Sequence, residues 1–143
     1  MLILVLDAAG LTLDWCLRCV AAGHTVKLYT EDDKAKPIGE GLVDKIDNWK
    51  KFVDAADLIF IADNMKFMDE VQDLIDKGYP VFGPGRKAAR LELDRMYGQN
   101  SIKAYGGPVI PSIEFSDYAA AIKYIKENPK RYVCKPVGEE EDK

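Results

Sequence analysis

A continuous apolar run near the start of the chain constrains its fold more than any other feature. Residues 2–6 read Leu-Ile-Leu-Val-Leu, with no polar residue at alternate positions. A strand with one solvent-exposed face would alternate, whereas a parallel strand covered on both faces is apolar throughout. The run therefore predicts a buried strand of a parallel sheet.

The pattern of strands and helices continues through residue 82. We expect strands at 2–6, 25–29, 58–61 and 79–82, and helices near 13–20, 47–55 and 67–77. This βαβαβαβ alternation is the signature of an open α/β sheet with right-handed crossovers. It predicts a Rossmann-like fold, with the strands in the order 2-1-3-4.

The segment Gly83-Pro84-Gly85 interrupts this pattern and predicts a domain boundary. We expect one domain at 1–83 and a second, incomplete one at 84–143. The second would contain helices at 86–95, 97–105 and 116–127 and a last strand at 132–135. Pro111 limits residues 109–115 to short edge strands at most.

Composition narrows the classes of partner. The net charge of −4 argues against nucleic acid and anionic membranes as partners. No apolar run approaches the roughly 20 residues of a membrane-spanning helix, so a cytoplasmic protein is expected. Cys16 and Cys19 form a C-x-x-C pair, but His24 is the single histidine and no second pair completes a zinc site. We therefore expect free, buried thiols and no metal site.

Polar residues follow two strands that the predicted order makes neighbours. Asp7 follows the first strand, and Asp63 and Asn64 follow the third. Ligands of open α/β sheets bind outside the carboxyl ends of such strands, where the winding reverses. Two carboxylates there would suit an amine, a ribose hydroxyl or a metal. Alternatively, each Asp caps the turn or helix that follows it.

The glycines and Lys135 are weaker indicators of a ligand site than the two aspartates. Gly10 alone stands in the first turn, so the G-x-G-x-x-G fingerprint of dinucleotide binding is absent. The turn at Gly83-Pro84-Gly85 precedes a helix, where it could hold an anion with backbone N–H groups or serve only as a hinge. Lys135 closes an apolar segment before Pro136 and could face a phosphate, or be an ordinary edge lysine.

Several segments in the second half carry a family resemblance. They are Val81-Phe-Gly-Pro84, Ala88-Ala-Arg-Leu-Glu92, Tyr105-Gly-Gly-Pro108 and the segment that ends in Lys135. In this order they resemble the join between the first two domains of phosphoribosylamine–glycine ligases (glycinamide ribonucleotide synthetases), members of the ATP-grasp superfamily. The resemblance implies a pre-ATP-grasp domain followed by the start of an ATP-grasp α+β subdomain.

The resemblance also implies roles for individual residues. Lys135 would contact the ATP phosphates, and Arg95 takes the place of the family's first nucleotide-contacting lysine. Departures occur on the substrate side: the family's Gly-Gly-Arg-Glu-His-Ala is here residues 9–14, without its arginine or histidine. The substrate-side candidates are Asp7, Gly10, Asp63, Asn64, Gly83 and Pro84.

The implied activity is that of a carboxylate–amine ligase, which forms an acylphosphate from ATP and transfers the acyl group to an amine. ATP and Mg²⁺ are the cofactors expected for the complete enzyme. The family's magnesium ligands lie beyond position 143, so we expect this chain to be inactive alone.

One alternative function is a non-catalytic binding module with an apolar patch near Ile110, Ile113 and Val133. A second copy or a missing C-terminal lobe would cover that patch. A second alternative function is that of a flavodoxin-like nucleotide-binding domain at 1–82.

Overall fold

The structure is a computed structural model that describes residues 1–63 and 66–135. The chain divides into two compact units, Met1–Ala89 (unit 1) and Arg90–Lys143 (unit 2). The division falls within helix α3 (Arg86–Leu93), just beyond the glycine turn where the sequence predicts a boundary. Each unit is described by itself.

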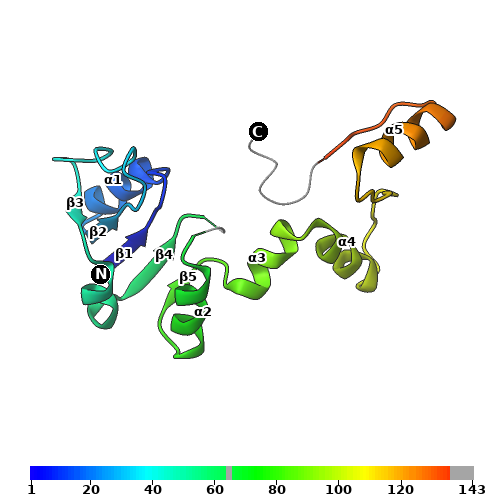
Figure 1. Cartoon of the computed structure of the whole chain (residues 1–143). Coiled ribbons are helices and arrows are strands. Elements are labelled where there is room, and N and C mark those ends of the chain that lie inside the picture. Colours follow the sequence, from blue (N-terminus) through cyan, green and yellow to red (C-terminus); the bar gives the residue numbers. More distant parts are fainter. Residues whose placement is uncertain (64–65, 136–143) are drawn as a thin grey trace. The chain divides into compact units, whose positions relative to one another are not determined.

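Unit 1 contains one parallel five-stranded sheet in the order β3-β2-β1-β4-β5 (Figure 1). Its strands are β1 (Leu2–Leu6), β2 (Thr25–Tyr29), β3 (Asp44–Ile46), β4 (Leu58–Ile61) and β5 (Val81–Phe82). The four expected strands form in the predicted order, so the α/β prediction is confirmed. The chain reverses its winding between β1 and β4.

Helices cover the two faces of this sheet. Helix α1 (Leu13–Ala21) buries Cys16 against a cluster that contains Ile3 and Val5. The 3₁₀ helix η1 (Trp49–Ala55) and helix α2 (Met68–Asp76) pack on the other face, against a cluster that contains Leu4 and Leu6. Alternate residues of β1 thus point into two separate cores, which explains why the strand is apolar throughout.

Two local predictions in unit 1 were wrong. Strand β3 was not expected, because two of its three residues are charged. It pairs with β2, and Lys27 forms an ion pair with Asp44 in the same register. The helix expected from residue 47 begins at Trp49 instead, because Asn48 caps it: Asn48 has extended backbone and its side chain accepts a hydrogen bond from the Lys50 N–H at 3.1 Å.

Unit 2 contains helices α4 (Arg95–Ala104) and α5 (Tyr118–Glu127). Asp94 caps α4 by accepting from the Tyr97 N–H at 2.9 Å, so this helix begins before the predicted residue 97. Asp117, not Ser116, caps α5 through the Ala120 N–H at 2.8 Å. The two caps explain both starting points.

The strands predicted in unit 2 do not form. Residues 109–115 and 132–135 carry no strand, because among the described residues neither segment pairs with another through backbone hydrogen bonds. The helix predicted at 116–127 forms, but it has no buried face. Tyr118 is 71% exposed, Ile122 is 52% exposed, and no residue of α5 is buried. Unit 1 therefore has a closed core, whereas the described residues of unit 2 form none of comparable size.

No helix in residues 1–63 or 66–135 has the length and apolar character needed to span a lipid bilayer.

Candidate functional site

The structure places Asp7 and Asp63 at the point where the winding reverses. Asp7 directly follows β1 and Asp63 lies just beyond β4, the neighbouring strand. The Ala62 N–H donates to the Leu6 carbonyl at 2.9 Å, so the ladder continues to the residues that precede both carboxylates. Asn64, the third predicted residue here, lies outside the described residues.

The Asp7 carboxylate is directed into the chain's own first turn. It accepts hydrogen bonds from the Gly10 N–H at 2.8 Å, the Thr12 N–H at 2.7 Å and the Thr12 hydroxyl at 2.5 Å. Asp7 is fully buried. These donors satisfy a carboxylate that solvent does not reach, which favours the capping alternative for Asp7.

Asp63 has a similar local contact and a more open position. Its Oδ1 accepts from the Lys66 N–H at 2.8 Å, in the turn that leads to α2. Asp63 is half-buried, unlike Asp7. Of the two carboxylates predicted at this edge, Asp63 is therefore the more accessible to a ligand.

The Gly10 turn is closed by the segment between β2 and β3. Gly10 has φ of +75°, and a Cβ atom there would lie 2.7 Å from Ile38 Cδ1. Its N–H is already bonded to Asp7. Since the backbone donor is occupied and Ile38 covers the turn, a phosphate could not approach Gly10 as it approaches a glycine-rich loop.

A half-buried cation near Asp7, Lys45, was not identified from the sequence. Lys45 Nζ donates to Thr30 Oγ1 at 2.8 Å and to the Ile38 carbonyl at 2.9 Å. Burial lowers the pKa of Lys45, and the Asp7 carboxylate opposes that shift. Lys45 thus ties the segment over Gly10 to the sheet. No sequence signal identifies it, because its partners are distant in the chain.

Gly83 is required by close packing. A Cβ atom at Gly83 would lie 2.5 Å from the Cβ of Ile61, the last residue of β4. Pro84 is half-buried, and a Cβ at Gly85 would meet the Gln72 side chain at 2.6 Å. The turn therefore packs against β4 and α2, which supports the hinge alternative over an anion site.

The two predicted nucleotide contacts both belong to unit 2. Arg95 is the first residue of α4 and is half-buried. Lys135 is exposed at the end of the extended segment 131–135, and Pro136 lies outside the described residues. Their roles toward ATP stay predictions.

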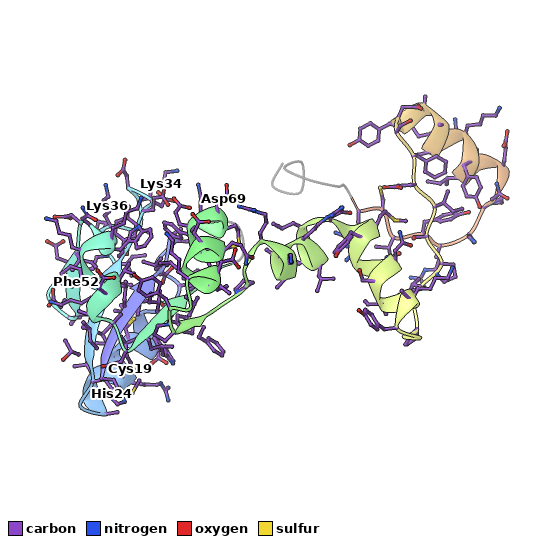
Figure 2. The ribbon with its side chains drawn as sticks, turned by 90° about the horizontal axis from the view of Figure 1, so that it is seen from below. Cys19, His24, Lys34, Lys36, Phe52 and Asp69 are labelled. Carbon is purple, nitrogen blue, oxygen red and sulfur yellow. The ribbon has the colours of Figure 1, made fainter. Side chains whose placement is uncertain are left out.

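The cysteines form no disulfide and no metal site. Cys16 is buried and Cys19 half-buried, both with free thiols, and burial raises the pKa of each. Figure 2 shows Cys19 and His24 at one end of unit 1, with Lys34, Lys36 and Asp69 at the opposite end. Among the described residues, no group of three or more His, Cys, Asp or Glu side chains could hold a metal ion.

Sequence comparison with curated proteins gives two informative matches. The chain is 38% identical over 61 residues to the bifunctional purine biosynthetic protein PUR2,5 of Pichia angusta, covering 43% of this chain. It is 30% identical over 82 residues to the phosphoribosylamine–glycine ligase of Lactococcus lactis, covering 57% of this chain. The resemblance to phosphoribosylamine–glycine ligase is confirmed. The chain spans only 8% and 20% of the lengths of these two relatives.

Solved structures of other proteins share the fold of this chain. An N5-carboxyaminoimidazole synthetase from Staphylococcus aureus, complexed with ADP, matches 88% of this chain with a TM-score of 0.66 and 17% identity. The N5-carboxyaminoimidazole ribonucleotide synthetase from Thermotoga maritima matches 86% of it, with a TM-score of 0.66 and 15% identity. The matched regions cover 36% of each of these chains. No family model matches the chain.

Proposed function

We propose that this chain is the N-terminal part of an ATP-dependent carboxylate–amine ligase that acts in purine nucleotide biosynthesis. The observation that carries the proposal is the 30% identity over 82 residues to a phosphoribosylamine–glycine ligase. The parallel sheet of unit 1 agrees with it, because ATP-grasp enzymes of similar fold match most of the chain.

The described residues fit part of what ATP requires. Arg95 and Lys135 would supply two positive charges for phosphate oxygens, both from unit 2. ATP would supply the phosphoryl group that activates a carboxylate for attack by an amine. The carboxylate cluster that a magnesium ion needs is not found among the described residues, so no step here is assigned to the metal.

On the substrate side, the geometry favours an amine or hydroxyl over a phosphate. Ile38 covers the Gly10 turn, and Asp7 uses the backbone donor there. Asp63 remains half-buried at the edge where ligands of open sheets bind. We assign Asp63 to contact an amine or ribose hydroxyl of the substrate.

The exposed apolar surface of unit 2 supports a further element of the proposal. Ile110 is 82% exposed, Ile113 is 55% exposed and Val133 is 83% exposed. Such a set of apolar side chains normally belongs against another folded surface. We propose that the remaining ATP-grasp lobe covers it; a concentration-dependent dimer in light scattering would instead favour a second copy.

The proposal is tested by comparing two polypeptides. One is the 143-residue chain, and the other is the product of the whole reading frame that contains it. ADP release in the presence of candidate amine and carboxylate pairs is expected only from the longer product. Ligation by the 143-residue chain alone would contradict the assignment of this chain as an inactive part.

A further inference from the structure

A second candidate site lies at the carboxyl edge of unit 1, and its lining does not include Gly10. An open pocket of about 610 Å³ is lined by the end of β2, by residues 47–50 and by residues 66–70 at the start of α2. Pockets of a few hundred to a thousand Å³ accommodate small organic ligands. None of the predicted site residues that the structure describes lines it.

The base of the pocket is aromatic. The Phe67 ring contacts the Tyr29 ring edge-on, with centroids 5.9 Å apart, and the Trp49 ring at 6.4 Å. Trp49 is almost fully buried, whereas Tyr29 and Phe67 are half-buried. The exposed parts of Tyr29 and Phe67 therefore offer an aromatic surface to a ligand.

Phe67 is held in an unfavourable backbone conformation. With φ of 61° and ψ of 12° it is the one non-glycine residue with positive φ among the described residues. This region costs a residue with a side chain roughly 1–2 kcal/mol. Such conformations persist where the surrounding structure imposes them, and they cluster at ligand sites.

The charges around the pocket are predominantly negative. Glu31, Asp47 and Glu70 line it, and none of them forms an ion pair within the described part of the chain. Asp69 is already bound by Arg86, whose Nε lies 2.8 Å from its Oδ1. Two lysines, Lys50 and Lys66, also line the pocket, so four carboxylates face two ammonium groups. The balance disfavours phosphate and favours groups that donate hydrogen bonds.

Glu31 has a position with a known chemical use. It lies two residues beyond β2 and about twenty residues after Gly10. In Rossmann-like folds, an acidic residue at this place accepts hydrogen bonds from ribose hydroxyls. The pocket thus combines an aromatic surface with a carboxylate suited to a diol.

From these observations we propose that the pocket binds a nucleoside without a phosphate group, with its base against Tyr29 and Phe67 and its ribose hydroxyls donating to Glu31. The proposal does not rest on the ligase assignment. All of these residues are in unit 1, while the residues assigned to ATP are in unit 2.

The test is titration of the ¹⁵N-labelled full chain with adenosine, followed by amide chemical shifts. Shifts are expected at residues 29–31, 47–50 and 66–70. Adenosine 5′-monophosphate and 2′,3′-dideoxyadenosine are each expected to bind about tenfold more weakly, because one adds a repelled phosphate and the other lacks the diol. No shifts at millimolar adenosine, or shifts centred on Gly10 and Thr12, would overturn the proposal.

A pair of variants makes the test specific. Glu31→Gln keeps the shape of the side chain and removes its charge, so adenosine affinity should fall about tenfold. Asp73→Asn makes the same charge change on an exposed residue of α2 that does not line the pocket, and should leave affinity unchanged. Equal affinities for Glu31→Gln and the unaltered chain would contradict the assignment of the diol contact.

Discussion

The Asp7 carboxylate accepts hydrogen bonds from both the backbone N–H and the hydroxyl of Thr12, over 2.7 and 2.5 Å. Thr12 is the residue before α1, so this contact joins the end of β1 to the start of the first helix. The site edge is thus shaped by contacts within the chain, and Asp7 belongs to its framework.

Replacing Asp7 should therefore affect stability. Asp7→Ala leaves the buried N–H of Thr12 without its acceptor and should lower the free energy of unfolding by roughly 1–3 kcal/mol. Urea denaturation followed by circular dichroism measures this. Asp14→Ala, which removes an exposed carboxylate paired with Arg18, is the matched control and should have a much smaller effect. Equal decreases in the free energy of unfolding for both variants would contradict the structural role of Asp7.

Substitution of two glycines can test whether Ile38 closes the first turn. Gly10 and Gly41 have similar φ values of +75° and +72°, but only a Cβ at Gly10 would meet another side chain. Gly41→Ala should cost about 1 kcal/mol through its backbone alone, and Gly10→Ala should cost more because Ile38 must move. Thermal unfolding of both variants gives the difference. A Gly10→Ala variant as stable as Gly41→Ala would show that Ile38 does not close the turn.

The turn after β5 should be intolerant of side chains. In Gly83→Ala the new Cβ would lie 2.5 Å from the Cβ of Ile61, in the strand that precedes Asp63. We expect a loss of several degrees in Tm or failure to fold, because overpacking a core typically costs about 1–3 kcal/mol. Gly78→Ala, at φ of +82° with open space around it, is the control and should remain folded with a smaller loss. Similar Tm values for the two variants would contradict the packing argument.

Thiol reactivity should follow burial. Burial raises the pKa of Cys16 above its usual value of 9.0, so at pH 8 less of it is thiolate, the reactive form. Cys134 is exposed. Alkylation by iodoacetamide should modify Cys134 first, Cys19 later and Cys16 only when the chain unfolds. Mass spectrometry of peptides gives the order, and Cys134→Ser should remove the fastest phase. Early modification of Cys16 would contradict its burial.

The sign of the Cys16 shift also sets a pH dependence. Because the pKa in the folded chain is raised, the contribution of the protonated thiol to stability is complete below the unfolded pKa. This stabilising contribution is lost as the pH rises from the pKa of the unfolded chain through the pKa of the folded chain. Stability should therefore fall on the alkaline side more steeply than in Cys16→Ala, which lacks the titrating group.

The sequence was sufficient to predict the sheet of unit 1 because burial on both faces leaves a clear mark. The apolar run at residues 2–6 and the regular alternation after it specify parallel strands and their order. Strand β3 has no such mark: it exists because Asp44–Ile46 pairs with β2, a contact between distant segments. Pattern alone does not report pairing of that kind.

The same limit applies to the site. Asp7 and Asp63 were placed correctly from the ends of their strands, but the inward direction of the Asp7 carboxylate depends on Gly10 and Thr12. Lys45 and Phe67 act through contacts with residues far away in sequence. In unit 2, residues 132–135 have the composition of a strand but pair with no strand among the described residues, so composition predicted a strand that does not form.

The most direct test of the central claim concerns Lys135 in the product of the whole reading frame. Loss of one preorganised hydrogen-bond donor to a developing charge typically costs about 10²–10³-fold in kcat, so by analogy Lys135→Ala should lower kcat/KM for ATP by about a hundredfold. Lys123→Ala, an exposed lysine of α5, should leave kcat/KM unchanged. If ADP release by Lys135→Ala equals that of Lys123→Ala, this lysine does not contact the phosphates and the ligase assignment loses its main residue.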